Sequence, residues 1–435
     1  MRYESINSDL FSLNRRNFVK HMKPNSLAVF TSNSILTRSA DAAYKWRQNP
    51  DLFYLCGIDQ EETFLVLFPD APEAKHREVL FVRRTNEHIM WWEGKKHTLD
   101  EARSISGIET VTWSDNFEGM LCLFMNHAEN VYLNTNEHDR SINMGETHEA
   151  KFARDLMGKY PLHKFERSAP IMHNLRVSKS AVEVELLRKA IDITHKGFLR
   201  ALGFIKPGVW EFEVEAELTA EYIRNRGTGH AYEPIIATGV NACVLHYVTN
   251  DAQCKAGDLL LMDAASEYAS YNADLTRTVP VSGKFTKRQK NVYNAVLRVH
   301  NEAKAMMRSG ITLTDLNNEV GKVMESELLG LRLLNKTDIK NQSKESPAFK
   351  KYFPHGTAHF LGLDVHDVGD RYAKLKPGAV LTCEPGIYIR EENMGIRIEN
   401  NILVTKGNPV DLMKDIPIEA EEIEEIMNKQ SLMVV

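Results

Sequence analysis

The sequence lacks several features that would assign it to a specialised class of protein. No hydrophobic run approaches the ~18 residues that a membrane-spanning helix needs. Cysteine is scarce, with five scattered residues among 435 and no C-x-x-C spacing, so we expect no disulfide framework. Basic residues are not in excess either, because the formal net charge is −5, which argues against binding to nucleic acid.

The start of the chain also lacks targeting features. Residues 1–22 hold no apolar core of signal-peptide length, and the acidic Glu4 and Asp9 argue against a transit peptide. Together with the scattered, odd-numbered thiols, these features predict a cytoplasmic protein with reduced cysteines and no association with membranes.

What is present indicates two domains. The chain has enough apolar residues, 43% of the total, for large cores, and its 435 residues are long for a single domain. The first part alternates helical stretches with strand-like runs, which is typical of an α/β domain with a mixed sheet. The strand-like runs cover residues 26–32, 51–58, 63–70, 78–84 and 130–135. A stretch without clear periodicity follows, and a boundary within it gives domains 1–172 and 173–435.

The second part contains a faint internal repeat. The segments GVWEFEVEAEL, from Gly208, and GITLTDLNNEV, from Gly310, share an aliphatic residue one position after the glycine, an acid five after and Glu nine after. Such a match could arise by chance, because amphipathic helices resemble one another. Each segment is followed, however, by a strand-rich stretch with two carboxylates, and this favours a duplication.

The two strand-rich stretches each predict a hairpin with facing carboxylates. Asp263 ends the apolar run LLLM and falls opposite Asp274 in the first hairpin, while Glu384 falls opposite Glu399 in the second. Side chains paired directly across an antiparallel ladder have Cβ atoms roughly 5 Å apart. Two such carboxylates repel each other, and a divalent cation between them removes the conflict.

The stretch HGTAHFLGLDVHDVG supplies histidines to the same region. His355 and His359 stand four apart, but Gly356 occupies the position of the Glu in the zinc-protease pattern H-E-x-x-H. Four carboxylates and one imidazole suit two divalent ions such as Mn²⁺, Co²⁺, Fe²⁺ or Zn²⁺. The spacing alone leaves His355, His359 and His366 as candidate ligands.

These residues resemble a known family. The ordered carboxylates and histidine, with the motifs DAASEYASYNADLTRT, HGTAHFLGLDVHDVG, EPGIYI, GIRIEN and TGVNACVLHY, are similar to the pita-bread metallopeptidases, and within them to aminopeptidase P. The segment ADAAYKWRQNPDLFYLCG resembles the family's creatinase-like N-terminal domain, so the resemblance covers effectively the whole chain. It implies an α+β fold class, with a duplicated pita-bread catalytic domain after an α/β creatinase-like domain that has a mixed sheet.

The resemblance also implies the metal ligands. Asp263 is expected to bind one metal ion and His359 and Glu384 the other, while Asp274 and Glu399 contact both. Two divalent ions are implied, with Mn²⁺ as our first choice and Zn²⁺, Co²⁺ or Fe²⁺ as alternatives.

The catalytic roles come from the same resemblance. Glu384 is expected to take a proton from a metal-activated water and pass it to the departing proline nitrogen. His246, His355 and His366 are expected to hold the substrate and stabilise the tetrahedral intermediate, and Arg397 to act as a positively charged residue behind the ligands.

The implied activity is that of an Xaa-Pro aminopeptidase, a metallo-exopeptidase acting on peptides with proline in second position. Proline offers no amide N–H, so its recognition depends on ring shape and apolar contact, for which we select His355, Tyr232 and Trp92. Trp92 lies in the first domain and could reach a neighbouring subunit's site or simply pack beside Trp91. The resemblance further implies a homo-oligomer, a dimer or tetramer.

Prolidase is the main alternative, because Arg397 or Arg371 could hold the free carboxylate of an Xaa-Pro dipeptide. We favour the aminopeptidase because the turn at 391–395 has no long insertion and the first domain is more similar to aminopeptidase P. A methionine aminopeptidase would lack the large first domain. A creatinase-type enzyme, or a metal-free module that binds peptides or histones, would lack the metal ligands, and all five are present.

Overall fold

The computed structural model describes residues 2–141, 145–343 and 345–431. By their contacts these residues form two compact units. One comprises Glu4–Arg176, and the other comprises the described residues from Val177 onward together with residues 2–3. The division follows shortly after the expected boundary at residue 172, because the helix that spans this position, α7 (Ala169–Val177), groups with the N-terminal unit except for its last residue. Among the described residues, no helix has the length and apolar character needed to span a bilayer.

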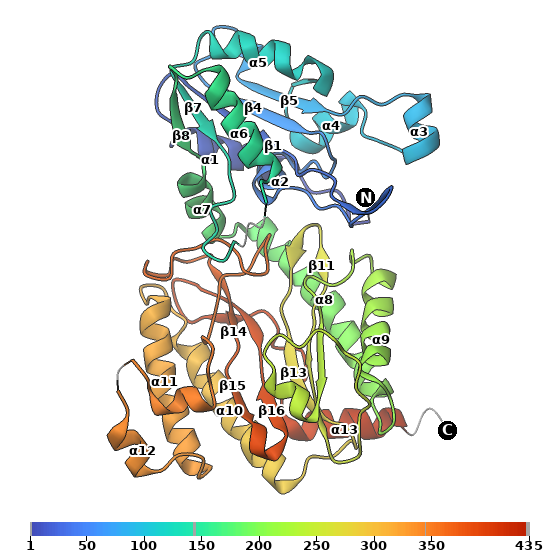
Figure 1. The fold of residues 1–435 in the computed structure, drawn as a ribbon, viewed down its shortest axis with the longest axis vertical. Coiled ribbons are helices and arrows are strands. Elements are labelled where there is room, and N and C mark those ends of the chain that lie inside the picture. Colours follow the sequence, from blue (N-terminus) through green and yellow to red (C-terminus); the bar gives the residue numbers. More distant parts are fainter. Residues whose placement is uncertain (1, 142–144, 344, 432–435) are drawn as a thin grey trace. The chain divides into compact units, whose positions relative to one another are not determined.

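The N-terminal unit is built on a six-stranded sheet with the order β6-β5-β4-β1-β7-β8 (Figure 1). Its strands are β1 (Ser26–Thr31), β4 (Phe64–Leu67), β5 (Glu78–Val82), β6 (Thr110–Trp113), β7 (Asn130–Leu133) and β8 (Lys164–Arg167). The sheet is mixed, as predicted, since β4 pairs antiparallel with β1 and β5 while the outer pairs are parallel. A short hairpin of β2 (Thr37–Ser39) and β3 (Ala42–Ala43) lies outside it.

Apolar side chains from both the strands and the helices of this unit form its core, among them Val29, Val66, Phe81 and Phe124. The remaining helices of the unit are α1 (Asp9–Val19), α2 (Pro50–Cys56), α3 (Glu87–Glu93), α4 (Leu99–Ser106), α5 (Phe117–Met125) and α6 (His148–Lys159).

The strand predicted at residues 51–58 is wrong, because this segment forms α2. The side chain of Asn49 accepts hydrogen bonds from two backbone N–H groups of the first turn, and Pro50 occupies the first helical position. Gly57 ends the helix with a φ of 68°, a conformation that glycine adopts without strain. These cap residues outweigh the strand-like appearance of a fully buried apolar run.

The C-terminal unit consists of two similar halves. In each half a pair of packed helices precedes a three-stranded antiparallel sheet, β13-β10-β9 in the first half and β14-β17-β18 in the second. In Figure 1 the strands lie between the helix pairs α8–α9 and α10–α11. The helices are α8 (Ala181–Phe204), α9 (Glu211–Arg224), α10 (Lys287–Met306), α11 (Leu313–Gly330), α12 (Lys336–Asn341) and α13 (Ala420–Ser431).

The strands of this unit also form two small hairpins, β11-β12 and β15-β16. The bounds of all its strands are β9 (Ile235–Thr238), β10 (Leu259–Asp263), β11 (Glu267–Tyr268), β12 (Tyr271–Asn272), β13 (Thr276–Pro280), β14 (Val380–Cys383), β15 (Gly386–Ile389), β16 (Met394–Arg397), β17 (Asn400–Leu403) and β18 (Val410–Asp411).

The predicted register of the first carboxylate hairpin is wrong by two residues. Asp263 pairs with Thr276 rather than with Asp274, because the chain reverses at Ala269 and Ser270. Both turn residues have positive φ, 51° and 64°, as in the tight two-residue turns that connect hairpin strands. Asp274 is therefore a diagonal neighbour of Asp263, still within reach on the same part of the sheet.

The predicted register of the second carboxylate hairpin is confirmed. β14 pairs with β17 and β15 pairs with β16 in one continuous register, in which Cys383 faces Asn400. Glu384 and Glu399 are the next residues along the two strands and so occupy facing positions.

Candidate metal centre and substrate pocket

The two halves of the C-terminal unit meet at the carboxylates. An isolated bridge joins Thr276 to Glu399, and the Thr276 hydroxyl donates a hydrogen bond to Glu399 Oε2 at 2.6 Å. Next to it, the side chain of Asn401 accepts from the backbone N–H of Asp274 and donates to its carbonyl, at 3.2 and 2.7 Å. These bonds hold acids that are distant in sequence close to one another.

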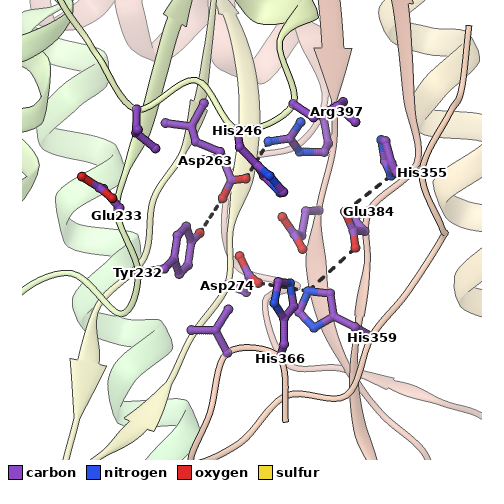
Figure 2. Close-up of a pocket in the computed structure, with 15 residues that line it drawn as sticks. Tyr232, Glu233, His246, Asp263, Asp274, His355, His359, His366, Glu384 and Arg397 are labelled. Carbon is purple, nitrogen blue, oxygen red and sulfur yellow. Dashed lines mark hydrogen bonds and ion pairs between the residues drawn. The ribbon is translucent and has the colours of Figure 1, made fainter. Parts of the chain in front are cut away.

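A cavity of about 330 Å³ opens at this junction. Every candidate site residue from the sequence lines it except Trp92 (Figure 2). The five predicted ligands are Asp263, Asp274, His359, Glu384 and Glu399. The predicted substrate-side residues in the lining are Tyr232, His246, His355, His366 and Arg397.

Three buried residues, Asp274, His359 and Glu399, offer ligand atoms that all lie within 4.8 Å of one another. His359 Nε2 lies 3.4 Å from Asp274 Oδ2 and 3.7 Å from Glu384 Oε1. Its other ring nitrogen, Nδ1, lies 3.0 Å from the carbonyl oxygen of Phe360. When Nδ1 donates to this carbonyl, Nε2 is left as the metal-binding nitrogen. Of the three histidines that spacing left open, His359 is therefore the one whose ring is arranged as a ligand.

The chemistry of this donor set fits divalent cations. Burial is the main cause of a raised pKa at three of these carboxylates. It raises the pKa of Asp263, raises the pKa of Glu399 well above its usual value, and raises the pKa of Glu384 to about 7. The charges of the neighbouring carboxylates add to this effect. Arg397 forms a direct ion pair with Asp263, at 2.5 Å. One guanidinium does not balance four buried carboxylates, whereas divalent cations bound by oxygen atoms and one imidazole nitrogen would do so.

A hydrogen-bonded chain extends from the acids to His355. The Arg397 guanidinium bonds Asp263 through Nη2 and donates through Nη1 to the Tyr388 hydroxyl, at 2.9 Å. The Tyr388 oxygen lies 2.7 Å from His355 Nε2, and His355 Nδ1 lies 2.8 Å from the Gly356 carbonyl oxygen. Burial, and then the charge of Arg397, lower the pKa of His355 to about 3, so this imidazole is neutral. Nδ1 therefore donates to the carbonyl, and Nε2 accepts from Tyr388.

Sequence reasoning missed Tyr388, although a signal for it was present. Residues at even spacing along a strand share a face, so Tyr388 follows Glu384 on the side of the ligands. Tyr232 was expected against the proline ring, but its hydroxyl hydrogen-bonds Asp263 Oδ1 at 2.5 Å. It therefore orients a candidate ligand as well as lining the cavity.

The remaining histidines lie at the open side of the cavity. His246 and His366 are both exposed, and the His366 ring packs edge-on against His359 with ring centroids 4.4 Å apart. Four apolar residues that we did not predict also line the cavity, namely Ile235, Leu245, Val248 and Val365. Trp92 lies on α3 of the N-terminal unit and is 78% exposed, so in this chain it does not pack as a buried aromatic.

Comparison with known proteins decides the family. The model of metallopeptidase family M24 matches residues 185–406, and that of the aminopeptidase P N-terminal domain matches residues 11–132. The chain belongs to metallopeptidase family M24. This M24 protein is 34% identical to the Xaa-Pro aminopeptidase of Escherichia coli K12, over 97% of this chain and 98% of that protein. It is 32% identical to human Xaa-Pro aminopeptidase 3, over 93% of this chain and 81% of that protein.

Solved structures agree with the sequence relatives. A variant of E. coli aminopeptidase P in complex with substrate has a TM-score of 0.88 at 31% identity, covering 99% of this M24 chain and 100% of that chain. Aminopeptidase PepP of Pseudomonas aeruginosa has a TM-score of 0.90 at 29% identity, covering 98% and 99%. The predicted resemblance to aminopeptidase P and the predicted fold class are confirmed, as is the expectation of a metallopeptidase.

Proposed function

We propose that this M24 protein is an Xaa-Pro aminopeptidase, which hydrolyses the bond between the first residue of a peptide and a following proline. The observation that carries the proposal is one cavity that combines a buried acidic centre, a neutral His355 and apolar walls. It lies in a chain that is similar over nearly its whole length to Xaa-Pro aminopeptidases.

Two divalent cations, Mn²⁺ in the first place, are proposed to complete the site. Asp263 would hold one, His359 and Glu384 the other, and Asp274 and Glu399 both. When bound, such cations supply the Lewis-acid chemistry that makes water a nucleophile near neutral pH. A solved E. coli aminopeptidase P is described as zinc-substituted and in complex with product, so Zn²⁺ stays an alternative, as do Co²⁺ and Fe²⁺.

Glu384 is proposed to move the proton. Its carboxylate lies between two histidines, with Oε2 3.6 Å from His355 Nδ1 and Oε1 3.7 Å from His359 Nε2. A buried carboxylate with a raised pKa is a stronger base than an exposed one. Glu384 can thus accept a proton from the attacking water and return it to the departing proline nitrogen.

The histidines are proposed to hold the peptide. His246 and His366, on the open side, would donate hydrogen bonds to the carbonyl oxygen as negative charge develops on it. The apolar side chains of Leu245, Val248 and Val365 offer the contact that a proline ring needs, since it has no N–H for recognition. Trp92 stays a prediction for this recognition, as do the assembly into a dimer or tetramer and the cytoplasmic location.

Prolidase activity is less well supported by the cavity. Arg397 is already engaged by Asp263 and Tyr388, and Arg371 does not line the cavity. Neither guanidinium is thus placed to hold the free carboxylate of a dipeptide.

The test compares hydrolysis of an Xaa-Pro dipeptide with that of an Xaa-Pro-Pro tripeptide, both with Mn²⁺. We expect release of the first residue from the tripeptide and little turnover of the dipeptide, with both rates abolished by a chelator. Preference for the dipeptide would instead make the protein a prolidase, and turnover that survives chelation would contradict the metal-dependent mechanism.

A further inference from the structure

A loop without regular sheet or α-helix carries His246. This 239–251 loop begins with η3 (Gly239–Cys243) and rejoins the scaffold at Ala252. Within the described part of the chain, the His246 ring forms no hydrogen bond that would fix its position. The location of this imidazole in the cavity therefore depends on how the backbone of the loop is held.

One carboxylate, that of Glu211, bonds to both ends of the loop. Glu211, the first residue of α9, is fully buried, and all four of its partners are donors. Its Oε1 accepts from the backbone N–H of Thr238 at 2.7 Å and from the Asn241 side chain at 3.3 Å. Its Oε2 accepts from the Tyr247 hydroxyl at 2.8 Å and from the backbone N–H of Ala252 at 2.9 Å. One of these partners, Thr238, lies just before the loop, two lie within it, and Ala252 follows it.

We propose that Glu211 is a positioning residue, which fixes His246 for the substrate by fastening the 239–251 loop around its carboxylate. The most direct link is Tyr247, the neighbour of His246, whose hydroxyl is bound to Glu211 and whose ring packs on a small core that includes Tyr388. The inference rests on the proposed role of His246 in binding the substrate.

The helix itself does not need this carboxylate. The start of α9 is capped by Glu213, whose side chain accepts from the backbone N–H of Trp210 at 2.8 Å. Glu211 turns away from this cap, and its side-chain bonds go to residues outside the helix. Its burial is therefore explained by the loop and not by helix capping.

A second contact also holds the loop. A Cβ added to Gly395, on β16, would lie 2.2 Å from the carbonyl oxygen of Ala242, so the loop touches the strand that leads to Arg397. The loop is thus held both by the carboxylate of Glu211 and by its contact with β16. This leaves little freedom for its backbone while Glu211 is in place.

The Glu211→Gln substitution tests the proposal because it keeps the shape of the side chain. Each carboxylate oxygen faces a backbone N–H, that of Thr238 or that of Ala252, so the new amide NH₂ must face a donor in either orientation. One end of the loop loses its acceptor in each case. We expect kcat/KM for an Xaa-Pro-Pro tripeptide to fall about 10- to 100-fold, as for a displaced catalytic group, with unchanged metal content.

A double-mutant cycle with His246→Ala separates positioning from general damage to the fold. If Glu211 acts through His246, Glu211→Gln should change kcat/KM less than about threefold once His246 is already alanine. If Glu211→Gln lowers kcat/KM by the same factor in the presence and in the absence of His246, the proposal is overturned. If His246→Ala alone leaves turnover intact, the proposed role of His246 fails and this inference with it, while tripeptide hydrolysis by the unaltered protein still tests the activity separately.

Two further variants complete the design. Glu183→Gln is the matched control, because Glu183 is also a buried carboxylate at a helix start and is bound by a tyrosine, Tyr271, but it does not contact the loop. Its effect should be the same with and without His246. Tyr247→Phe removes a single hydroxyl and keeps the packed ring. It should cause a smaller loss that is also coupled to His246, and it decides the matter if Glu211→Gln does not fold.

Discussion

Binding of divalent cations should release protons from this protein near neutral pH. In the chelated protein the carboxylates of the candidate metal centre lie close together in a buried site. Burial raises the pKa of Glu384 to about 7 and that of Glu399 well above its usual value, and the charges of Asp274 and other acids act in the same direction. Both groups must be deprotonated to hold a cation. Below about pH 7, loading the site with cations is therefore expected to displace at least one proton.

The raised pKa of Glu384 sets how much the stability gained from cation binding should change with pH. Its shift from 4.5 to about 7 corresponds to about 3 kcal/mol, since one pKa unit is about 1.4 kcal/mol. Because the pKa of Glu384 is raised in the folded chelated protein, the contribution of this group to stability is fully present below pH 4.5. It is lost as the pH rises through 7. The free energy of unfolding of the cation-loaded protein should thus exceed that of the chelated protein by an amount that grows with pH over this window.

Calorimetric titration of the chelated protein with Mn²⁺, repeated at one pH in buffers of different ionisation enthalpy, counts the protons released. We expect the count to decrease as the titration is moved from below to above pH 7, and to be smaller by about one for Glu384→Gln below pH 7. Thermal unfolding with and without Mn²⁺ across the same pH range gives the stability difference. A heat of binding that is independent of the buffer, or a stability difference that does not grow with pH, would refute this account of the acidic centre.

Three substitutions test other parts of the C-terminal unit. Glu384→Gln should keep the fold and lower kcat by about 10²- to 10⁴-fold, and near-normal turnover would refute its role as proton shuttle. Lys179→Met breaks an ion pair with Asp367 whose side chains are both 1% exposed, so chemical denaturation should show a loss of about 3–5 kcal/mol, partly recovered when Asp367 is also made apolar. Gly395→Ala places a Cβ 2.2 Å from a carbonyl oxygen of η3 and should lower stability by about 1–3 kcal/mol, whereas Gly330→Ala, in open space on α11, should not.

Much of the candidate metal centre could be predicted because its carboxylates follow simple strand arithmetic. The second hairpin has a short turn and a register without a shift, and Glu384 and Glu399 face each other as counting from the turn requires. The first hairpin deviates because Ala269 and Ser270 adopt positive φ, which residue type did not suggest, and the reversal moves by one position. An error of one position at a turn changes every pair along the strands by two residues.

The choice among the histidines could not come from spacing. It depends on which ring nitrogen is engaged elsewhere, and for His359 this is decided by the carbonyl of Phe360, a contact made only in the folded chain. Likewise, the neutral state of His355 depends on burial and on Arg397, which arrives from another strand. The error at residues 51–58 was different, because the signals Asn49, Pro50 and Gly57 were visible in the sequence.

The faint repeat acquires a physical meaning in the structure. Seven residues after Gly208 stands Glu215, and seven residues after Gly310 stands Asn317. Glu215 accepts a hydrogen bond at 2.8 Å from the side chain of Asn250, at the end of the loop that carries His246.

Asn317 accepts at 2.8 Å from the backbone N–H of Thr357, two residues after His355. In both halves the same position on the second helix therefore reaches the chain next to a cavity histidine. The side-chain types differ, so sequence comparison of the two halves shows little at this position. A duplicated scaffold that places a polar side chain at one register position of each helix can support two different histidine segments around one acidic centre.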